Sequence, residues 1–355
     1  MNIKAVCVSL LTLAVAGCGQ ADKLVPGYHT GTLGQSKYSI AVPDEWNGSL
    51  LLIAHGLRDE TAPLTAELDV NTPFYKGLLD DGWVIASTSY RRNGPIVRDA
   101  AADVDTLRQH VAGRMGKPRE VFVRGSSMGG AVAVLLAEAY PGCYDGFLAI
   151  GAALSLHDRS NPYRMTYKPS APIVFLTNQS ELGGPTVYCK EAAGAARPPA
   201  LWKVARDGHC NVNDSEGRLA LDGLVDYART GSIELFRDAT VAVAHKKSLA
   251  KFRNGKAYAM VVGLGESYGN LYTQFVQDDL DRLGIRQGDK FIVGMGDRSF
   301  EVLLGKDYSD VPRGRWVAFL TAEGTLKIAR NFADAAKTLG CKSGDEIHIT
   351  SLQKR

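Results

Sequence analysis

The sequence predicts an α/β fold, an open sheet sandwiched by helices, followed by a small β-rich, barrel-like domain. Three observations lead to this expectation. Short apolar runs recur through the first two thirds of the chain, helical patterns separate several of them, and past about residue 245 this alternation ends. The length of 355 residues fits two domains of roughly 150 residues each.

Composition places the chain among globular proteins. Hydrophobic residues make up 45% and charged residues 22%, close to the average for soluble domains. This excludes a disordered chain, a collagen-like chain and a polytopic membrane protein. The net charge is +3, from 41 Lys and Arg against 38 Asp and Glu, and no long basic block occurs. The sequence therefore shows no electrostatic footprint for nucleic-acid binding.

Residues 1–17 have the features of a signal peptide. Lys4 supplies a positive charge, and the apolar stretch Ala5 to Ala16 is too short to span a membrane comfortably. It ends in Val15-Ala16-Gly17-Cys18, which resembles the bacterial lipobox. That resemblance implies cleavage before Cys18, lipidation of Cys18 and anchoring in the bacterial cell envelope, on the periplasmic or extracellular face. The alternative is an ordinary signal peptide with a cysteine at this position by chance.

The apolar runs between residues 50 and 204 predict a parallel sheet. They are Leu50–Ala54, Trp83–Ser87, Val121–Val123, Phe147–Ile150, Ile173–Leu176 and Leu201–Val204. Such runs are typical of strands buried on both faces. The helical patterns between and after them are Asp99–Arg114, Gly129–Tyr140 and Ser215–Thr230. Ligands bind beyond the carboxyl ends of the strands in these sheets, so residues that follow the runs are candidates for chemistry.

The segment Gly125-Ser126-Ser127-Met128-Gly129 matches the pattern G-x-S-x-G. The bare pattern is weak evidence, but here it follows a predicted buried strand and precedes a small, apolar helix, as the motif requires. The turn would expose Ser127 Oγ at a helix N-terminus, where the helix dipole favours negative charge. We expect Ser127 to be a nucleophile and the Met128 N–H to be an oxyanion donor. The alternative is a glycine-rich turn without chemistry.

Of the seven histidines, His209 is the candidate base for Ser127. It follows the last strand of the predicted sheet and precedes a closing helix, so its loop could reach the serine. The alternative for any single histidine is a surface residue or a satisfied core residue. His55 follows the first core strand, in His55-Gly56-Leu57. There we expect it to shape the loop, with the Leu57 N–H as the second oxyanion donor.

The third group should be a carboxylate that orients the imidazole. The chain order serine, acid, histidine places it between positions 127 and 209, after a strand, and Glu181 is the candidate. Asp158, which follows the preceding strand, is an alternative. Asp207 lies two residues from His209, a spacing that disfavours a good approach. The other interpretation of these acids is a solvated loop carboxylate.

By these residues, about residues 38–230 resemble the α/β-hydrolase family. The matching pieces are His55-Gly56, the Gly-Ser-Ser-Met-Gly-Gly elbow and the late Gly-His. The resemblance implies a mostly parallel sheet between helices, and ester hydrolysis as the commonest activity. About 20 residues separate Ile150 from Ile173, which leaves room for a small cap and no large lid domain.

Six cysteines occur, and four remain once Cys7 is removed with the signal peptide and Cys18 carries lipid: Cys143, Cys189, Cys210 and Cys341. Disulfides can form in an exported protein, and the sequence leaves the pairing open. The His209-Cys210 pair further resembles secreted tannases and feruloyl esterases, in which this cysteine is bridged to one just before the nucleophile. Ser126 stands at that position here. The resemblance therefore implies another partner for Cys210, with Cys189 as the candidate.

Past about His245 the sequence predicts short strands, namely Ala257–Val262, Phe291–Val293, Phe300–Leu304, Trp316–Leu320 and Glu346–Ile349. An internal repeat also occurs, because Leu283 to Asp289 recurs as Leu339 to Asp345. Each copy closes a helical stretch with a glycine, turns and leads into a strand.

About residues 256–350 resemble the C-terminal domain of the S-adenosylmethionine hydroxide adenosyltransferases and related halogenases. The resemblance rests mainly on 268–273, 308–314 and 324–331, and continues through 335–340. In that family the aromatic-Gly-Asn segment helps to hold the adenosyl group, which implies Tyr268 and Asn270 as candidate nucleoside-binding residues. Thr321-Ala322 replaces the Asn-Ser pair of the family, and its catalytic N-terminal domain is absent. We therefore expect a spacer or docking role, or a retained ligand site, rather than adenosyl transfer.

Together these features predict an exported, lipid-anchored serine hydrolase that cleaves carboxylic esters with Ser127, His209 and Glu181, without a metal or organic cofactor. A peptidase or thioesterase on the same residues is one alternative, and a cell-surface protein that binds an adenosine-like ligand is another. The expected partners are a small ester and, through Cys18, the membrane. We expect a hydrolase domain over 19–240 that folds and acts without the β-rich domain over 246–355.

Overall fold

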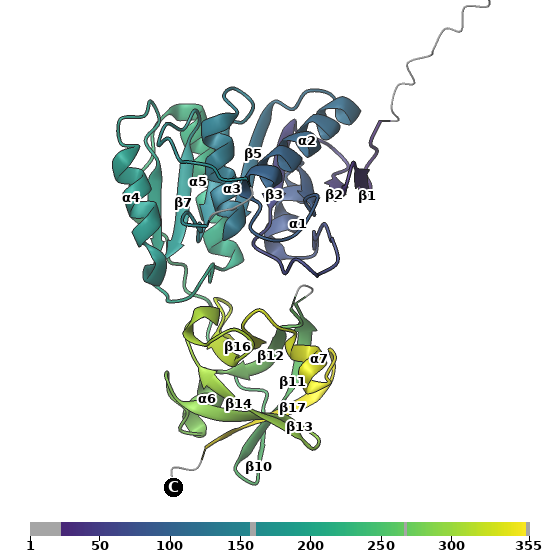
Figure 1. Cartoon of the computed structure of the whole chain (residues 1–355), viewed down its shortest axis with the longest axis vertical. Helices are drawn as coiled ribbons and strands as arrows, with labels where there is room; N and C mark the ends of the chain where they lie inside the picture. Colours follow the sequence, from purple (N-terminus) through teal and green to yellow (C-terminus); the bar gives the residue numbers. More distant parts are fainter. Residues whose placement is uncertain (1–22, 157–160, 266–267, 353–355) are drawn as a thin grey trace, which may run out of the picture.

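The computed structural model describes residues 23–156, 161–265 and 268–352. The predicted signal peptide, Cys18 and Asp158 lie outside these residues. The described residues form two parts, an α/β unit and a β-barrel that lies at one end of it (Figure 1). Within the described residues, no helix is both long and apolar enough to cross a membrane.

The first part is built on a nine-stranded sheet. In spatial order its strands are β1 (Gly27–Leu33), β2 (Ser36–Val42), β4 (Val84–Thr88), β3 (Ser49–Ala54), β5 (Glu120–Ser126), β6 (Gly146–Ile150), β7 (Ile173–Asn178), β8 (Ala200–Val204) and β9 (Phe236–Asp238). The β1–β2 hairpin is antiparallel and adds antiparallel to β4, whereas β4 through β9 are parallel. The carboxyl ends of seven strands therefore lie at one edge of the sheet.

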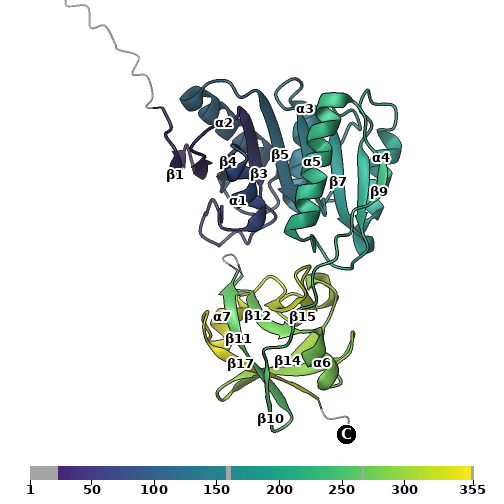
Figure 2. The same cartoon turned by 180° about the vertical axis from the view of Figure 1, so that it is seen from behind.

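Helices cover both faces of this sheet. They are α1 (Pro73–Asp80), α2 (Val97–Met115), α3 (Met128–Ala139), α4 (Gly183–Glu191) and α5 (Asp214–Thr230). Alternate residues of β3 separate the two cores: Leu50 and Leu52 pack with α2, α3 and α4, and Leu51 and Ile53 pack with α1 and α5. Figure 2, the view from behind, shows α5 crossing the face of the sheet that is turned away from the viewer in Figure 1. Central strands are thus apolar on both faces, which is the physical origin of the continuous apolar runs.

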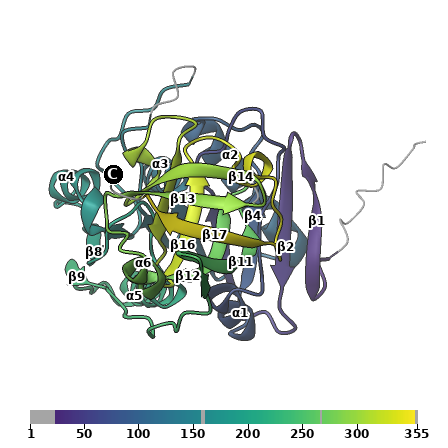
Figure 3. The ribbon, with the colours of Figure 1, turned by 90° about the horizontal axis from the view of Figure 1, so that it is seen from below.

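The second part is a closed barrel of seven strands, as the sequence predicted in outline. Around the barrel they run β11 (Lys256–Leu264), β12 (Leu271–Val276), β16 (Thr325–Arg330), β15 (Trp316–Leu320), β14 (Arg298–Leu304), β13 (Lys290–Met295) and β17 (Glu346–Ser351), and β17 pairs back with β11. A short strand, β10 (Lys251–Arg253), pairs with β11 as a hairpin. Figure 3 shows the barrel from its own side, in front of the α/β unit.

The internal repeat has the predicted local structure in both copies. Helix α6 (Gln277–Arg282) is followed, after its cap residue Leu283, by Gly284, and helix α7 (Ala335–Leu339) is capped by Gly340, with φ of 66° and 79° at the two glycines. In each copy an aspartate then closes the turn, Asp289 accepting from the Arg286 N–H and Asp345 from the Lys342 N–H, both at 2.9 Å. Strands β13 and β17 follow, so each copy of the repeat ends a helix, forms a turn and leads into a strand.

The sequence prediction missed several elements. It placed the six central strands and three helices correctly, but it omitted the β1–β2 hairpin, α1, α4 and β9, as well as β12 and β16 of the barrel. β1 and β9 are exposed or half-exposed along their length and lack an apolar run, whereas β2 is mostly buried but has only three consecutive apolar residues, Ile40 to Val42. β12 and β16 interleave polar residues with apolar ones, because one face of each strand lies outside the barrel core.

Candidate active site

Ser127 lies in a sharp turn between β5 and α3, with φ of 58° and ψ of −118°. Two glycines allow the helix to approach the sheet closely there. A Cβ at Gly125 would lie 2.0 Å from the Gly129 carbonyl oxygen, and one at Gly129 would lie 1.9 Å from that of Ala54. No larger residue fits at either position. The glycines of the motif are thus required by backbone packing, and they hold Ser127 at the N-terminus of α3.

His209 and Glu181 meet Ser127 in a hydrogen-bonded chain. His209 Nε2 lies 2.7 Å from Ser127 Oγ, and His209 Nδ1 lies 2.6 Å from Glu181 Oε2. Each residue follows the carboxyl end of a parallel strand: Ser127 follows β5, Glu181 follows β7 and His209 follows β8. The structure therefore brings together the three side chains that the sequence singled out as nucleophile, base and acid.

A polar network at the end of β7 holds the His209 loop, and the sequence reasoning did not find it. Asn178, fully buried, donates to the carbonyl oxygens of Arg206 and Asn211 at 3.1 and 2.9 Å and accepts from the Asn211 N–H at 2.8 Å. Ser180 Oγ accepts from the Gly208 N–H at 3.0 Å. Glu181 belongs to the short helix η1 (Gln179–Glu181) that follows. A polar residue ending an otherwise apolar strand was the signal that could have identified Asn178.

Of the two other candidate acids, Asp207 and Asp158, the structure describes only Asp207. Asp207 pairs with Lys306 at 2.8 Å and accepts from Gln179 at 3.0 Å, whereas the partner of His209 Nδ1 is Glu181. Asp158 lies outside the described residues. Glu181 Oε1 also accepts from the Cys210 N–H at 3.1 Å, so both carboxylate oxygens bind the histidine segment.

The surroundings of His209 favour its protonated form. Burial lowers the pKa of the imidazole, but the adjacent Cys210 sulfur and the Glu181 carboxylate outweigh this effect and raise the pKa well above its usual value. An imidazole with a raised pKa is a stronger base once it is deprotonated. It accepts a proton from Ser127 more readily, and it requires a higher pH to become neutral.

Cys210 forms no disulfide, and the candidate pairing with Cys189 is wrong. Both thiols are free, as are Cys143 and Cys341. Cys189 packs against the core on the α2, α3 and α4 side of the sheet, whereas Cys210 packs against the core on the opposite side. Cys210 Sγ instead lies 3.4 Å from the Ile150 carbonyl oxygen and 3.9 Å from His209 Nε2. It is therefore a neighbour of the candidate base.

The loop after β3 lies against Ser127. A Cβ at Gly56 would be 3.2 Å from Ser127 Cβ. His55 shapes this loop: its ring stacks on Tyr90 at 3.9 Å, and its Nδ1 lies 2.7 Å from the Gly56 carbonyl oxygen. Burial, aided by Arg58, lowers the pKa of His55 to about 3, so this imidazole stays neutral. Leu57 follows in the same loop and Met128 follows Ser127 directly, positions compatible with the expected oxyanion donors.

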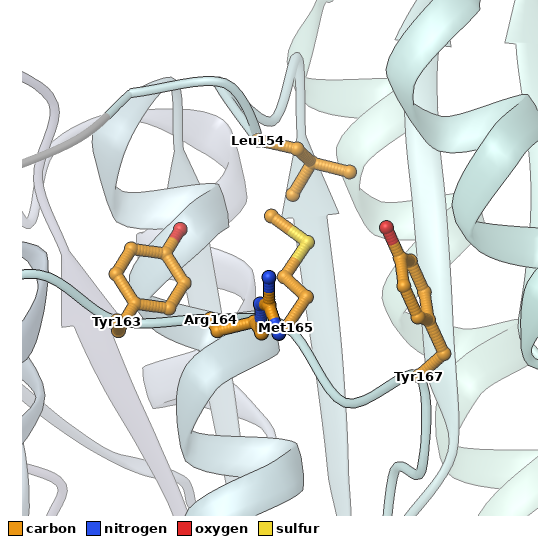
Figure 4. Close-up of a pocket in the computed structure, with 5 residues that line it drawn as sticks. All are labelled: Leu154, Tyr163, Arg164, Met165 and Tyr167. Atoms are coloured by element: carbon orange, nitrogen blue, oxygen red, sulfur yellow. The ribbon is translucent and has the colours of Figure 1, made fainter.

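A cavity of about 600 Å³ lies in the segment between β6 and β7. It is lined by Leu154, Tyr163, Arg164, Met165 and Tyr167. Figure 4 shows Leu154 and Met165 pointing toward each other between the rings of Tyr163 and Tyr167. The neighbouring Ala153 N–H donates to the Ser127 carbonyl oxygen at 3.0 Å, which places the start of this segment beside the nucleophile.

Metal ligands can also be considered at this site. Single ligand atoms of Glu181, His209 and Cys210 all lie within 4.8 Å of one another, and carboxylate, imidazole and thiolate groups can each bind zinc. However, both nitrogens of His209 already lie within hydrogen-bond distance of Glu181 and Ser127. A metal ion would have to replace one of these bonds, so the geometry fits proton transfer better than metal binding.

The candidate nucleoside-binding residues of the barrel lie close together. Asn270 donates from Nδ2 to the Tyr308 hydroxyl at 3.1 Å. Its Oδ1 atom and the Tyr268 hydroxyl are buried without a hydrogen-bond partner within the described residues. Burial and the nearby Asp59 carboxylate raise the pKa of Tyr268. Tyr268 thus lies beside the loop that follows β3 in the α/β unit.

Two family models match separate parts of the chain. Residues 86–179 match the family described as serine aminopeptidase, S33. Residues 265–348 match the SAM hydroxide adenosyltransferase C-terminal domain. The first range contains the Ser127 elbow and ends two residues before Glu181, whereas the second contains Tyr268 and Asn270. The predicted resemblances to the α/β-hydrolase family and to the adenosyltransferase C-terminal domain are therefore confirmed. The first part of the chain has the α/β-hydrolase fold.

The individual proteins to which the chain is similar share less than 30% of their residues with it in the aligned parts. A fluorinase from Nocardia brasiliensis is 26% identical over 276 residues, 77% of this chain and 78% of the relative. An uncharacterized conserved protein from Thermotoga maritima is 27% identical over 35% of this chain, with a TM-score of 0.28, and the match spans 47% of that protein, about half its length. Est1E from Butyrivibrio proteoclasticus is 11% identical over 57% of this chain and 97% of its own, with a TM-score of 0.41.

Replacing Gly129 by alanine should destabilise the α/β unit. The new Cβ would lie 1.9 Å from a backbone oxygen, so α3 would have to move away from β3, at a cost of about 1–3 kcal/mol or more. Urea denaturation should show a lower midpoint. The matched control is Gly113→Ala on α2, where nothing lies within 4 Å of the new Cβ and stability should rise by about 0.5–1 kcal/mol. Equal effects of the two changes would contradict this account of the elbow.

Replacing Glu181 by glutamine should change both the rate and its pH dependence. In the unchanged protein, hydrolysis should be lost as the pH falls through a His209 pKa above 6.5, because protonated imidazole cannot accept the Ser127 proton. The Gln variant lacks the carboxylate charge, so the acidic limb of kcat/KM should move to lower pH. At the plateau, kcat should fall sharply with little change in KM. An acidic limb that stays in place would show that Glu181 does not act on His209.

Proposed function

We propose that the chain is a serine hydrolase that cleaves carboxylic esters through an acyl-enzyme. The observation that carries this proposal is the hydrogen-bonded chain from Ser127 Oγ through the His209 imidazole to the Glu181 carboxylate. The positive φ of Ser127 at the start of α3 supports it further, because that backbone exposes the hydroxyl at a helix N-terminus.

In the proposed reaction, Ser127 Oγ attacks the acyl carbon while His209 Nε2 takes its proton. His209 then protonates the leaving alcohol, and the ester C–O bond breaks to give an acyl-serine. A water molecule, deprotonated by the same imidazole, attacks this intermediate and releases the carboxylic acid. Glu181 fixes the tautomer of His209 and stabilises the imidazolium. The N–H groups of Met128 and Leu57 would bind the oxyanion in both steps.

A peptidase or thioesterase that uses the same three residues is the second candidate. The family description for residues 86–179, serine aminopeptidase, supports a peptidase. A panel of 4-nitrophenyl esters, amino-acid 4-nitroanilides and acyl thioesters distinguishes the candidates through their kcat/KM values. We expect the esters to be preferred, because the expected small cap, without a large lid, suits soluble or exposed esters.

A binding protein for an adenosine-like ligand is a candidate from another class. Its support is the family model over residues 265–348 and the buried, unpartnered polar atoms of Tyr268 and Asn270. Titration of adenosine into the full chain by calorimetry tests it. Saturable binding that Asn270→Ala abolishes, in a protein that does not label with a fluorophosphonate, would favour this candidate over the hydrolase.

We also propose that the protein is exported and anchored by lipid at Cys18. The supporting sequence is the apolar stretch after Lys4, which ends in Val15-Ala16-Gly17-Cys18. Lipidation with more than one acyl chain would hold the protein stably at a bilayer, whereas a single chain would not. The α/β unit would then act on esters outside the cytoplasm.

Replacing Ser127 by alanine should abolish ester hydrolysis and leave the fold intact. Loss of the nucleophile should lower kcat by several orders of magnitude, as measured with a short-chain 4-nitrophenyl ester. A fluorophosphonate probe should label the unchanged protein at Ser127 and fail to label the variant. Ser126→Ala is the matched control and should be much milder. Retained turnover in purified Ser127→Ala protein would disprove the assignment.

Replacing Cys18 by serine should release the protein from the membrane fraction of bacterial cells. Mass spectrometry of the unchanged protein should identify a lipid-modified Cys18 as the first residue. The Cys143→Ser variant is the matched control and should remain with the membrane. A mature N-terminus at another residue would instead indicate an ordinary signal peptide.

A further inference from the structure

The barrel contacts both loops that flank Ser127. On the oxyanion side, Arg313 pairs with Asp59 at 3.1 Å. On the histidine side, Lys306 pairs with Asp207 at 2.8 Å, and Asn211 Nδ2 donates to the Leu320 carbonyl oxygen at 3.1 Å. The second domain therefore spans the two loops on either side of Ser127, which is more than a spacer would need.

The barrel surface between these contacts carries an aromatic and basic cluster. Lys327 of β16 is the cross-strand neighbour of Phe319 on β15 and of Tyr272 on β12. Its ammonium lies 4.8 Å from the ring centroid of Tyr272 and 5.6 Å from that of Phe319. Phe319 is only 6% exposed, and Lys327 is half-buried. These side chains lie on the outer face of the barrel wall.

Tyr308 connects this cluster to the histidine loop. Its ring meets the Phe319 ring at 5.1 Å, and its hydroxyl accepts from Asn270 Nδ2 at 3.1 Å. This arrangement leaves the phenolic hydrogen of Tyr308 available for donation. Burial raises the pKa of Tyr308, nearby Lys327 opposes that rise, and Cys210 is close enough to contribute to it. Phe319 is followed by Leu320, whose carbonyl oxygen accepts from Asn211 Nδ2 at 3.1 Å, so the cluster adjoins the loop that carries His209.

The charge of Lys327 faces aromatic rings rather than an acid, as far as the described residues extend. Among the described residues no carboxylate pairs with it, whereas the neighbouring cations Lys306 and Arg313 pair with acids of the α/β unit. Its partners are aromatic rings and the Tyr308 hydroxyl. The rings and the Tyr308 hydroxyl replace only part of the hydration that a half-buried ammonium loses, because no carboxylate among the described residues pairs with it. An anion bound there would compensate this loss.

We propose that this barrel face roofs the active site and that Lys327 and Tyr308 bind a carboxylate carried by the substrate. The proposal rests on the proposed ester hydrolysis at Ser127 and specifies its substrate class, an ester with an anionic group away from the scissile bond. Both polar groups donate hydrogen bonds, a pattern that suits a carboxylate and disfavours a cationic group. Tyr272, which is 38% exposed, would pack on the chain that carries the carboxylate.

The test compares charged and neutral esters of matched length. The 4-nitrophenyl hemiesters of succinate, glutarate and adipate place a carboxylate on the acyl side, and their methyl esters are the neutral controls. On the alcohol side, 4-acetoxybenzoate is compared with its methyl ester. For the unchanged chain, kcat/KM should favour the charged member in at least one pair. Lys327→Met should reduce that preference about ten- to hundredfold, mainly through KM, and Lys327→Arg should restore part of it.

Matched controls separate this effect from damage to the fold. Lys290→Met removes an exposed lysine that pairs with Glu301 on another part of the barrel and should leave the preference unchanged. If Lys327→Met does not fold, Tyr308→Phe removes the second donor and should also lower the preference. The proposal is overturned if the unchanged chain does not distinguish charged from neutral esters, or if the Lys327 and Tyr308 variants keep the original preference, while neutral esters are still hydrolysed.

A binding measurement keeps the proposal independent of turnover. Glutarate and 4-hydroxybenzoate, products of the two arms, are titrated into the Ser127→Ala protein and into the double variant that also carries Lys327→Met. Binding of either ligand that is lost in the double variant supports the carboxylate site even if no ester is hydrolysed. Equal or absent binding in both proteins counts against it. Failure of fluorophosphonate labelling at Ser127 would instead refute the proposed function.

Discussion

The position of Ser127 depends on one close backbone contact, the approach of α3 to the carboxyl end of β3. The Gly129 backbone passes so close to the Ala54 carbonyl oxygen that no side chain fits between them. Two further hydrogen bonds fix the turn. The Ser127 N–H donates to the oxygen of Ile150, the last residue of β6, at 2.9 Å, and the N–H of Ala153, just after β6, donates to the Ser127 oxygen at 3.0 Å. A positive φ at a serine is unfavourable by itself. It persists here because backbone contacts with two neighbouring strands, β3 and β6, hold the turn.

The other half of the candidate site depends on buried polar groups that are fully paired. Glu216 at the start of α5 is completely buried, pairs with Arg206 at 2.9 Å and accepts from the Asn213 N–H at 2.8 Å. Arg206 also donates to the Asn211 carbonyl oxygen at 2.8 Å. With Asn178 this network ties the His209 loop to β7 and α5. A network of this kind rigidifies a loop because each unmade bond would leave a buried polar atom unsatisfied.

The two parts of the chain meet through several modest contacts. The pairs Asp59–Arg313 and Asp207–Lys306 are partly exposed, and such ion pairs each contribute only about 0–1 kcal/mol. Asn211 Nδ2 also donates to the Leu320 carbonyl oxygen at 3.1 Å. These contacts join the barrel to the loops on both sides of Ser127. The barrel therefore belongs to the architecture of the candidate site.

The sequence by itself determined the order of the central strands along the chain, the elbow and the identity of the three candidate residues. Apolar runs and glycine spacing are local signals, and the parallel sheet brings the ends of its strands to one edge whatever the loops contain. It could not determine that Cys210 and Cys189 pack on opposite faces of the sheet, nor that Asn178 supports the histidine loop. Those facts depend on which face of a strand or helix each side chain occupies. Likewise, Lys327 is an ordinary lysine in the sequence. Only the closed barrel places it beside Tyr272 and Phe319, because its neighbours there come from strands that are distant in the chain.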